Sequence, residues 1–304
     1  MKPLAPLVVL GPTASGKSDV AMAYAAATPG VELVVVDAMQ VYRRMDIGTA
    51  KPSAADRAAV PHHALDVAEP SEEFTVAEFV AHGSVALHGI AARHARALLV
   101  AGTGLYLRAL TDPMEIPGQW PALRAEIEAR AMRDGPAVLH AELTALDPLA
   151  ASRMEAGNTR RLVRALEVTH GSGRPFSSFG PGLDHYPAVP FVQIGLMWER
   201  AVLTQRIATR VHLMMERGLL GEVAALLDEP EGLSRTAQQA LGYKELIAHL
   251  HGACSLDEAV DTIILRTRQF AVRQERWFRR DPRVRWVHIE HDPVAEVLPV
   301  LLTS

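Results

Sequence analysis

The segment Gly11-Pro-Thr-Ala-Ser-Gly-Lys-Ser18 constrains this chain more than any other, because it matches the pattern G-x-x-x-x-G-K-[S/T] at every fixed position. The apolar run Leu7–Leu10 before it predicts a buried strand, and the alanine-rich run 19–27 after it predicts a helix. Between a strand and a helix, the loop amides and the positive end of the helix favour a bound anion. The segment therefore predicts a phosphate loop, which is typical of nucleotide- and ATP-binding enzymes.

Within this loop, Gly11 and Gly16 allow the backbone to turn its amides inward, and Lys17 adds a positive charge. The hydroxyl of Ser18 is placed to bind a Mg²⁺ ion that shares the phosphate oxygens, because Mg²⁺ prefers oxygen ligands. We expect the whole loop to bind a pyrophosphate or nucleotide. Its residues are Gly11, Pro12, Thr13, Ala14, Ser15, Gly16, Lys17 and Ser18.

Strand and helix signals alternate along the first hundred residues. Buried strands are predicted at residues 32–36 and 97–101. The helix between them is predicted to begin after Thr75, which forms a capping-box pattern with Glu78, and to run to about His94. This alternation predicts an α/β fold with a P-loop NTPase-like parallel sheet flanked by helices, whose ligands lie at the carboxyl ends of the strands.

Two polar residues lie just after these predicted strands: Asp37 directly follows the first, and Thr103 follows Gly102 after the second. The carboxylate of Asp37 could bind Mg²⁺ or act as a general base, or it could only cap the next segment. Thr103 lies between two glycines, so it could bring a hydroxyl and amides close to a ligand or form a simple strand-to-helix turn. We expect Asp37, Thr103 and Lys17 to be the catalytic residues.

The pattern changes after Pro113, where helical spacing replaces the alternation and no strand is predicted before Phe191. We therefore divide the chain into a P-loop α/β catalytic core, residues 1–112 and 191–304, and an inserted all-helical subdomain, residues 113–190. In the second part of the core we expect helices at 200–218, 237–250 and 256–280, a strand at 284–288 and a terminal helix.

Composition limits the classes of function. The net charge of -4 argues against a uniformly basic nucleic-acid binder, although arginines cluster at 153–174 and 266–285, where they could also form solvated helix faces. The lone Cys254 excludes an intrachain disulfide and a cysteine zinc site, and the thirteen histidines show no metal-ligand spacing. The run Leu7–Leu10 is too short for a signal peptide or membrane span, so we expect a cytoplasmic protein.

Several ordered motifs resemble the tRNA dimethylallyltransferases, also called tRNA isopentenyltransferases. Besides the phosphate loop, they are Asp37-Ala-Met-Gln-Val-Tyr-Arg43, Met45-Asp-Ile-Gly-Thr-Ala-Lys-Pro52, Gly102-Thr-Gly-Leu-Tyr106, Arg161-Leu-Val-Arg-Ala-Leu-Glu-Val168, Leu241-Gly-Tyr-Lys-Glu245 and Thr267-Arg-Gln-Phe-Ala-Val-Arg-Gln-Glu-Arg-Trp-Phe-Arg279. The chain departs from the family at Ala38, where many relatives have Ser, at Val272, where Lys is usual, and at 155–158. These departures leave every proposed catalytic group in place.

The resemblance implies transfer of a dimethylallyl group from dimethylallyl pyrophosphate to the N6 atom of an adenosine beside the tRNA anticodon, with Mg²⁺. Asp37 would take the proton of the adenine amine, and Thr103 would contact the amine or the pyrophosphate. Lys17, Ser18 and the loop amides would hold the leaving group. Either Arg206 or Arg210 would close a cationic clamp on it, unless both only form surface ion pairs.

The same resemblance implies that the anticodon loop of tRNA is the partner and that its adenine is extruded from the stack. We see no obligate protein partner in the sequence and expect a monomer. The helix 267–279 would add contacts to the RNA backbone. The residues expected to bind tRNA are Asp37, Ala38, Met39, Gln40, Thr103, Arg124, Arg160, Arg161, Arg164, Gly242, Tyr243 and Lys244.

Three other functions remain open from the sequence. A prenyltransferase that acts on free adenylate would use the same chemistry, although it would need neither arginine cluster. A phosphate-loop kinase of nucleoside or shikimate type would place ATP in the loop and use Asp37 as the base. A non-catalytic nucleotide switch would leave Asp37 and Thr103 without a role.

Overall fold

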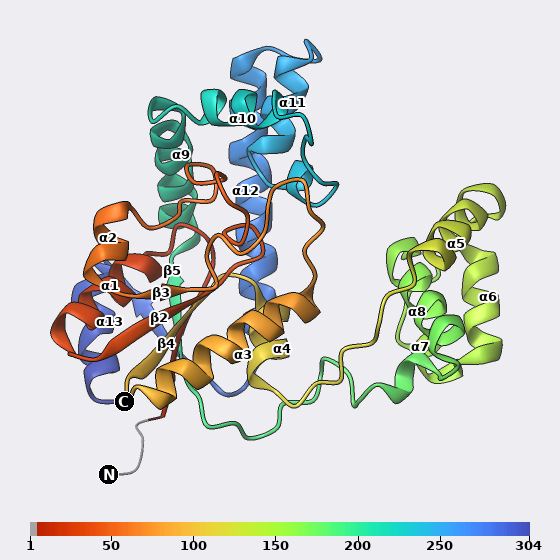
Figure 1. Cartoon of the computed structure of the whole chain (residues 1–304), viewed down its shortest axis with the longest axis horizontal. Coiled ribbons are helices and arrows are strands. Elements are labelled where there is room, and N and C mark those ends of the chain that lie inside the picture. The colour runs from red at the N-terminus through yellow and green to blue at the C-terminus, as the bar shows by residue number, and fades with distance from the viewer. Residues whose placement is uncertain (1–4) are drawn as a thin grey trace. The chain divides into compact units, whose positions relative to one another are not determined.

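The computed structural model describes residues 5–304, which form two compact units (Figure 1). One unit comprises residues 5–111 and 188–304, and the other comprises 112–187. In the described part of the chain, no helix is both long and apolar enough to cross a membrane.

A parallel sheet of six strands forms the centre of the larger unit, in the order β3-β2-β4-β1-β5-β6. β1 and β2 are continuous apolar runs apart from Glu32, and both are fully buried, as expected for strands covered on both faces. The strands are β1 (Leu7–Leu10), β2 (Val31–Val36), β3 (His62–His63), β4 (Arg96–Ala101), β5 (Val192–Trp198) and β6 (Val284–Ile289).

The strand order brings the predicted site segments to one edge of the sheet. β4 pairs with both β1 and β2, so Leu10 and Val36 both align with Ala101. The phosphate loop, Asp37 and Gly102 follow these three residues directly. The expected P-loop NTPase-like α/β fold is therefore confirmed, with its strand ends converging as a parallel sheet requires.

Helices cover both faces of this sheet. One apolar core contains Leu7, Val9 and residues of α1 and α13, and the other contains Val8, Leu10 and residues of α3 and α4. Beyond the carboxyl ends of the strands, α9 to α12 form a helical extension (Figure 1). The helices of this unit are α1 (Lys17–Ala27), α2 (Ala54–Ala59), α3 (Val76–Ala92), α4 (Gly104–Thr111), α9 (Arg200–Glu216), α10 (Leu219–Leu227), α11 (Tyr243–Leu250), α12 (Leu256–Phe278) and α13 (Pro293–Leu302).

Several boundaries differ from the sequence-based expectations. The predicted helix 237–250 is a 3₁₀ turn (Ala237–Gln239) followed by α11, because Gly242 has a φ of 92° that an α-helix cannot contain. The predicted helix 200–218 ends at Glu216, and α10 was not expected. The strand β3, which has only two residues, was also not expected. The capping box of Thr75 and Glu78 is confirmed.

The smaller unit, residues 112–187, contains helices and no strand. Its helices pack around a separate apolar core that includes Ile127, Leu139, Leu143, Leu162 and Leu166, each at most 1% exposed. They are α5 (Pro121–Asp134), α6 (Pro136–Leu146), α7 (Pro148–Ser152) and α8 (Thr159–Ser172), followed by a 3₁₀ turn (Phe176–Ser178).

Candidate active site

The loop between β1 and α1 has a conformation that requires both of its glycines. Gly11 and Gly16 have φ angles of 153° and 92°. A Cβ atom on Gly11 would lie 2.9 Å from the Leu196 carbonyl oxygen, and one on Gly16 would lie 2.6 Å from Cγ of Pro293. The tight turn directs the first amides of α1 out of its N-terminus, where helix geometry leaves them without carbonyl partners in the helix. Such a terminus binds anions.

Lys17 and Ser18 form the first turn of α1, beside this amide cluster. The ammonium of Lys17 donates a hydrogen bond to the Pro12 carbonyl oxygen over 2.7 Å. Burial of the ammonium and the charge of Arg210 lower the pKa of Lys17 to about 7, while Asp37 acts in the opposite direction. Ser18 is exposed, so its hydroxyl is accessible. A bound anion would relieve the repulsion between the two cations.

The two arginines of α9 are held in different ways. The guanidinium of Arg206 donates from Nε to the Ala14 carbonyl oxygen over 2.9 Å and lies 4.4 Å from the centroid of the Trp198 ring. Arg210 makes no hydrogen bond or ion pair with the residues that the structure describes. Burial lowers the pKa of Arg210, although the charges of Asp37 and Asp19 raise it. Arg206 thus braces the loop, whereas Arg210 is an unengaged cation near Lys17 and Asp37.

Asp37 directly follows β2, and its two carboxylate oxygens have different surroundings. Oδ1 accepts hydrogen bonds from the amides of Met39 at 2.8 Å and Gln40 at 3.2 Å. Oδ2 accepts none from residues 5–304 and lies 3.1 Å from the position of a Cβ atom on Gly102. The backbone therefore fixes the carboxylate through one oxygen and leaves the other able to accept a proton.

The segment after β4 completes this edge of the sheet. The hydroxyl of Thr103 accepts a hydrogen bond from the amide of Ala38 over 3.1 Å, so its own hydrogen remains able to donate. Gly104 contacts α12 so closely that a Cβ atom would lie 2.0 Å from Cδ1 of Trp277. The structure thus brings together Lys17, Asp37 and Thr103, which the sequence analysis expected to be neighbours.

One residue at this site, Gln274 of α12, was not singled out in the sequence. Its side chain is buried, accepts a hydrogen bond from the amide of Thr13 at 2.9 Å, and donates one to the Gly102 carbonyl oxygen at 2.8 Å. It therefore links the phosphate loop to the strand end beside Asp37, and the Thr13 amide is not available to a phosphate. In the sequence, Gln274 lies within the motif Thr267–Arg279, for which we expected only contacts to the RNA backbone.

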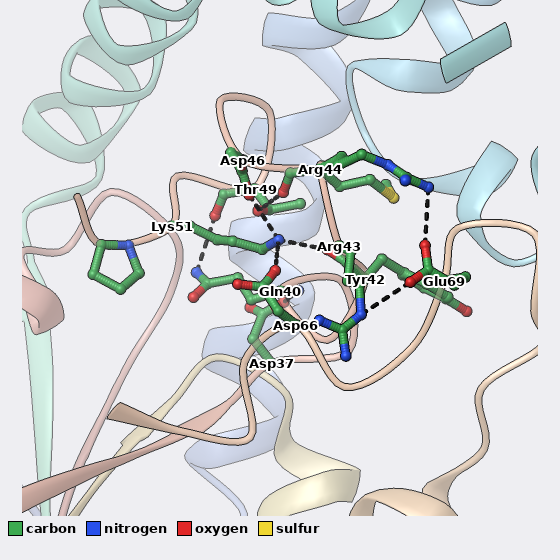
Figure 2. Close-up of polar contacts among 12 residues, drawn as sticks. Asp37, Gln40, Tyr42, Arg43, Arg44, Asp46, Thr49, Lys51, Asp66 and Glu69 are labelled. Atoms are coloured by element: carbon green, nitrogen blue, oxygen red, sulfur yellow. Dashed lines mark hydrogen bonds and ion pairs between the residues drawn. The ribbon is translucent and has the colours of Figure 1, made fainter. Parts of the chain in front are cut away.

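A polar network holds the loop that follows Asp37 (Figure 2). The ammonium of Lys51, whose side chain is 1% exposed, donates to the Tyr42 carbonyl oxygen at 2.5 Å and to the carboxylates of Asp46 at 2.8 Å and Asp66 at 2.5 Å. Gln40, which the sequence analysis assigned to tRNA binding, donates from its side chain to the Thr49 carbonyl oxygen at 3.0 Å. This network fixes residues 37–51 as one folded loop.

The segment 242–244 lies at the start of α11, and its three residues differ in exposure. Gly242 and Tyr243 are buried, and the Tyr243 hydroxyl donates a hydrogen bond to Glu222. Lys244 is exposed and donates to the side chain of Gln239 over 3.1 Å. Of the two side chains in this expected tRNA-binding segment, only that of Lys244 reaches the surface.

The four arginines expected to bind tRNA in the smaller unit fall into two pairs. Arg124 and Arg164 form ion pairs with Glu167, which is fully buried, at 3.7 Å and 3.0 Å. Arg164 also donates to the Pro117 carbonyl oxygen over 2.9 Å. Arg160 and Arg161, in contrast, are exposed and make no side-chain hydrogen bond or ion pair within the described residues.

The described residues contain no cluster of three or more His, Cys, Asp or Glu side chains that could hold a metal ion. Two oxygen donors at this edge of the sheet are the exposed hydroxyl of Ser18 and the Oδ2 atom of Asp37, which accepts no hydrogen bond from residues 5–304. This small set of oxygen donors fits Mg²⁺ rather than a softer metal, because Mg²⁺ keeps several waters and takes its other ligands from one or two protein oxygens and substrate phosphates.

The chain is similar over most of its length to several known proteins. The tRNA dimethylallyltransferase of Kocuria rhizophila is 48% identical over 285 residues, covering 93% of this chain and 89% of the relative. A solved tRNA isopentenylpyrophosphate transferase from Bacillus halodurans is 36% identical with a TM-score of 0.69, covering 98% of this chain and 96% of that structure. A eukaryotic dimethylallyltransferase, whose structure was solved acting on tRNA, is 25% identical with a TM-score of 0.77. The match covers 94% of this chain and 74% of that structure. The IPP transferase family model matches residues 40–281, and the chain belongs to this family.

Proposed function

We propose that this protein transfers a dimethylallyl group from dimethylallyl pyrophosphate to the N6 atom of an adenosine beside the anticodon of tRNA, giving N6-isopentenyladenosine. The observation that carries this proposal is the geometry of one sheet edge, where a phosphate loop with two cations lies beside a carboxylate with one free oxygen. The relatives named for the same reaction, which match almost the whole chain, support it further.

The donor side of the reaction uses the phosphate loop. The amides of the first turn of α1, the Lys17 ammonium and the Arg210 guanidinium would bind the pyrophosphate. Negative charge grows on this group as the allylic carbon–oxygen bond breaks, so fixed positive groups stabilise the transition state. Arg210 is the better candidate for the cationic clamp, because Arg206 already braces the Ala14 carbonyl. Mg²⁺, held by Ser18 and the phosphates, would add further stabilisation of this charge.

The acceptor side uses Asp37 and Thr103. The adenine amine attacks the allylic carbon, a carbon–nitrogen bond forms as the carbon–oxygen bond breaks, and the amine loses one proton. Oδ2 of Asp37 is free to accept that proton, while the amides on Oδ1 hold the carboxylate in place. Thr103 can donate its hydroxyl hydrogen to the reacting groups, because its oxygen is already fixed by the Ala38 amide.

The RNA partner is proposed to be the anticodon loop of tRNA, with its adenine flipped out of the stack. Two exposed arginines, Arg160 and Arg161, are free to contact phosphates, and Lys244 presents a further positive charge. Arg124 and Arg164 would act indirectly, because they form ion pairs with Glu167 of α8, the helix that carries the exposed pair. We also propose that the protein acts as a monomer in the cytoplasm, where its tRNA substrate is found.

The test is to incubate the purified protein and Mg²⁺ with unmodified tRNA and labelled dimethylallyl pyrophosphate, and to run parallel reactions with AMP as acceptor and with ATP as donor. We expect label in one anticodon-loop adenosine only. Label in AMP alone would indicate a free-nucleotide enzyme. Phosphate transfer from ATP without prenylation would indicate a kinase, and either result would overturn the proposal.

A further inference from the structure

The carboxylate of Glu222, on α10, accepts four hydrogen bonds from two separate segments of the chain. Oε2 accepts from the amides of Asp46 at 2.9 Å and Ile47 at 2.7 Å. Oε1 accepts from the amide of Gly48 at 3.1 Å and from the Tyr243 hydroxyl at 2.5 Å. One side chain therefore joins the loop after Asp46 to the start of α11.

The physical basis of this contact is a concavity of three successive backbone amides, the kind of feature that binds anions. Here the anion is supplied by the protein itself, and hydrogen bonds to a charged acceptor are stronger than neutral ones. The approach is also fixed sterically, because a Cβ atom on Gly48 would lie 2.5 Å from Cε2 of Tyr243. Burial and the nearby Glu222 raise the pKa of Tyr243, so its hydroxyl stays protonated and donates.

On one side, Glu222 connects to Asp37 through the loop shown in Figure 2. The amides held by Glu222 directly precede Thr49, whose carbonyl oxygen accepts from the side chain of Gln40 at 3.0 Å. The Gln40 amide, in turn, donates to Oδ1 of Asp37 at 3.2 Å. The orientation of the Asp37 carboxylate therefore depends on a loop whose far end is held by Glu222.

On the other side, Glu222 connects to the segment proposed to contact RNA. Tyr243 lies between Gly242 and the exposed Lys244 at the N-terminus of α11. A second carboxylate, that of Glu245, accepts from the Gly242 amide at 2.9 Å and forms an ion pair with Arg266 at 2.8 Å. Movement of this segment would therefore be transmitted to Glu222 through the Tyr243 hydroxyl.

We infer that Glu222 is a positioning residue for the acceptor side of the reaction, and that its bond with Tyr243 couples the RNA-contacting segment to the loop that orients Asp37. This inference rests on the proposed transfer to tRNA. Glu222 makes no hydrogen bond to the phosphate loop among the described residues, so it should affect the transfer step and leave donor binding unchanged.

The test is the variant Glu222→Gln, in which one oxygen becomes an amide nitrogen that cannot accept from the Gly48 amide. We expect the single-turnover rate of transfer, at saturating tRNA and dimethylallyl pyrophosphate, to fall about ten- to a hundredfold, because small misplacements of catalytic groups cost this much. Pyrophosphate affinity, measured by calorimetry, should stay within about twofold of wild type. Glu216→Gln, an exposed change at the end of α9, is the matched control and should leave the rate unchanged.

Tyr243→Phe is a milder second variant, because it keeps the buried ring and removes only the hydroxyl. We expect Tyr243→Phe to lower the same single-turnover rate. In the double variant with Glu222→Gln, the fold decrease in this rate should be smaller than the product of the two single decreases. If wild type transfers the group and both single variants match its rate, positioning by Glu222 is wrong while the proposed function stands. A parallel loss of donor affinity and melting temperature in both variants would also overturn it. If wild type transfers nothing to tRNA, the proposed function itself fails.

Discussion

The two ends of strand β2 carry carboxylates with opposite surroundings. Near its start, Glu32 is buried and accepts hydrogen bonds from Arg93 on both oxygens, at 2.9 Å and 2.8 Å, with His63 2.6 Å from Oε2. The hydrogen bonds from Arg93 lower the pKa of Glu32 to about 2. Just past the end of the strand, Asp37 has backbone amides on one oxygen and no partner from residues 5–304 on the other.

This difference separates a structural carboxylate from a chemically available one. Each oxygen of Glu32 accepts a hydrogen bond from the positively charged Arg93, so protonation would weaken these bonds and is disfavoured. Asp37 is oriented by neutral amides, and its free oxygen faces the edge where the phosphate loop and Thr103 converge. The strand thus presents one group that stabilises the fold and one that can exchange a proton with a ligand.

The variant Asp37→Asn is the most direct test of whether Asp37 exchanges a proton. The Asn oxygen can still accept from the amides of Met39 and Gln40, but the side chain can no longer take a proton. We expect single-turnover transfer to tRNA to fall about 10²–10⁴-fold, the usual contribution of a general base, with tRNA affinity nearly unchanged. Asp228→Asn, an exposed change at the end of α10, is the control. A rate within a few-fold of wild type would remove Asp37 as the base.

The complementary change is Glu32→Gln, at the other end of the strand. We expect the free energy of unfolding to fall by about 1–3 kcal/mol, because the charged hydrogen bonds to Arg93 are lost. The side chain of Arg93 is 53% exposed, so it is not left buried without a partner. Urea denaturation measures the loss, and the transfer rate should stay within about twofold of wild type. A large loss of rate without loss of stability would contradict the assignment of Glu32 to the fold alone.

The pH dependence of stability sharpens the same distinction. The pKa of Glu32 is about 2 in the folded protein against a reference value of 4.5, so the stabilisation is complete above about pH 4.5 and is lost as the pH falls toward 2. This lowering of the pKa corresponds to a stabilisation of at most about 3–4 kcal/mol, and solvent screening at Arg93 reduces that value. Unfolding of wild type and Glu32→Gln, compared at pH 7, 5, 4 and 3, should show a stability gap that narrows below about pH 4.5. If the difference in stability between wild type and Glu32→Gln stays constant down to pH 3, the ion pair with Arg93 does not cause it.

Local patterns predicted the parts of the site that lie in continuous sequence. The phosphate loop requires glycine at positions 11 and 16 because both residues have positive φ angles. Asp37 and Thr103 come after apolar strands that pair in parallel, so both residues lie at the carboxyl edge of the sheet. The family, the enzyme class and the fold were likewise correctly predicted from these motifs.

The sequence did not predict groups whose role depends on distant partners. Gln274 holds Thr13, which is 261 positions away along the chain, and no local pattern encodes that contact. Glu222 accepts a hydrogen bond from the amide of Gly48, which is 174 positions away along the chain. Burial cannot be read from residue type either, since Arg161 and Arg164 are alike in the sequence and differ in the folded unit.

Arg161 and Arg164 of α8 differ in the same way, since one is free and the other is paired. We expect their substitution to have smaller effects than the changes at Asp37 and Glu32. Arg161 is exposed and makes no side-chain hydrogen bond or ion pair within the described residues, so Arg161→Ala should reduce the salt dependence of tRNA binding by about one unit of slope, as for one lost phosphate contact. Stability should not change, and filter binding at several salt concentrations provides the measurement.

Arg164→Ala should behave in the opposite way. The change removes an ion pair with Glu167, whose side chain is 1% exposed. The buried carboxylate then keeps only the hydrogen bond from the Trp120 amide at 2.9 Å and the weaker 3.7 Å ion pair with Arg124 among the described residues. We expect the helical unit to lose about 1–3 kcal/mol of stability, because the buried carboxylate loses one of its partners, with a salt slope close to that of wild type when the unit is folded. If Arg164→Ala instead flattened the salt dependence without loss of stability, Arg164 would contact RNA directly, and its pairing with Glu167 would not hold in the complex.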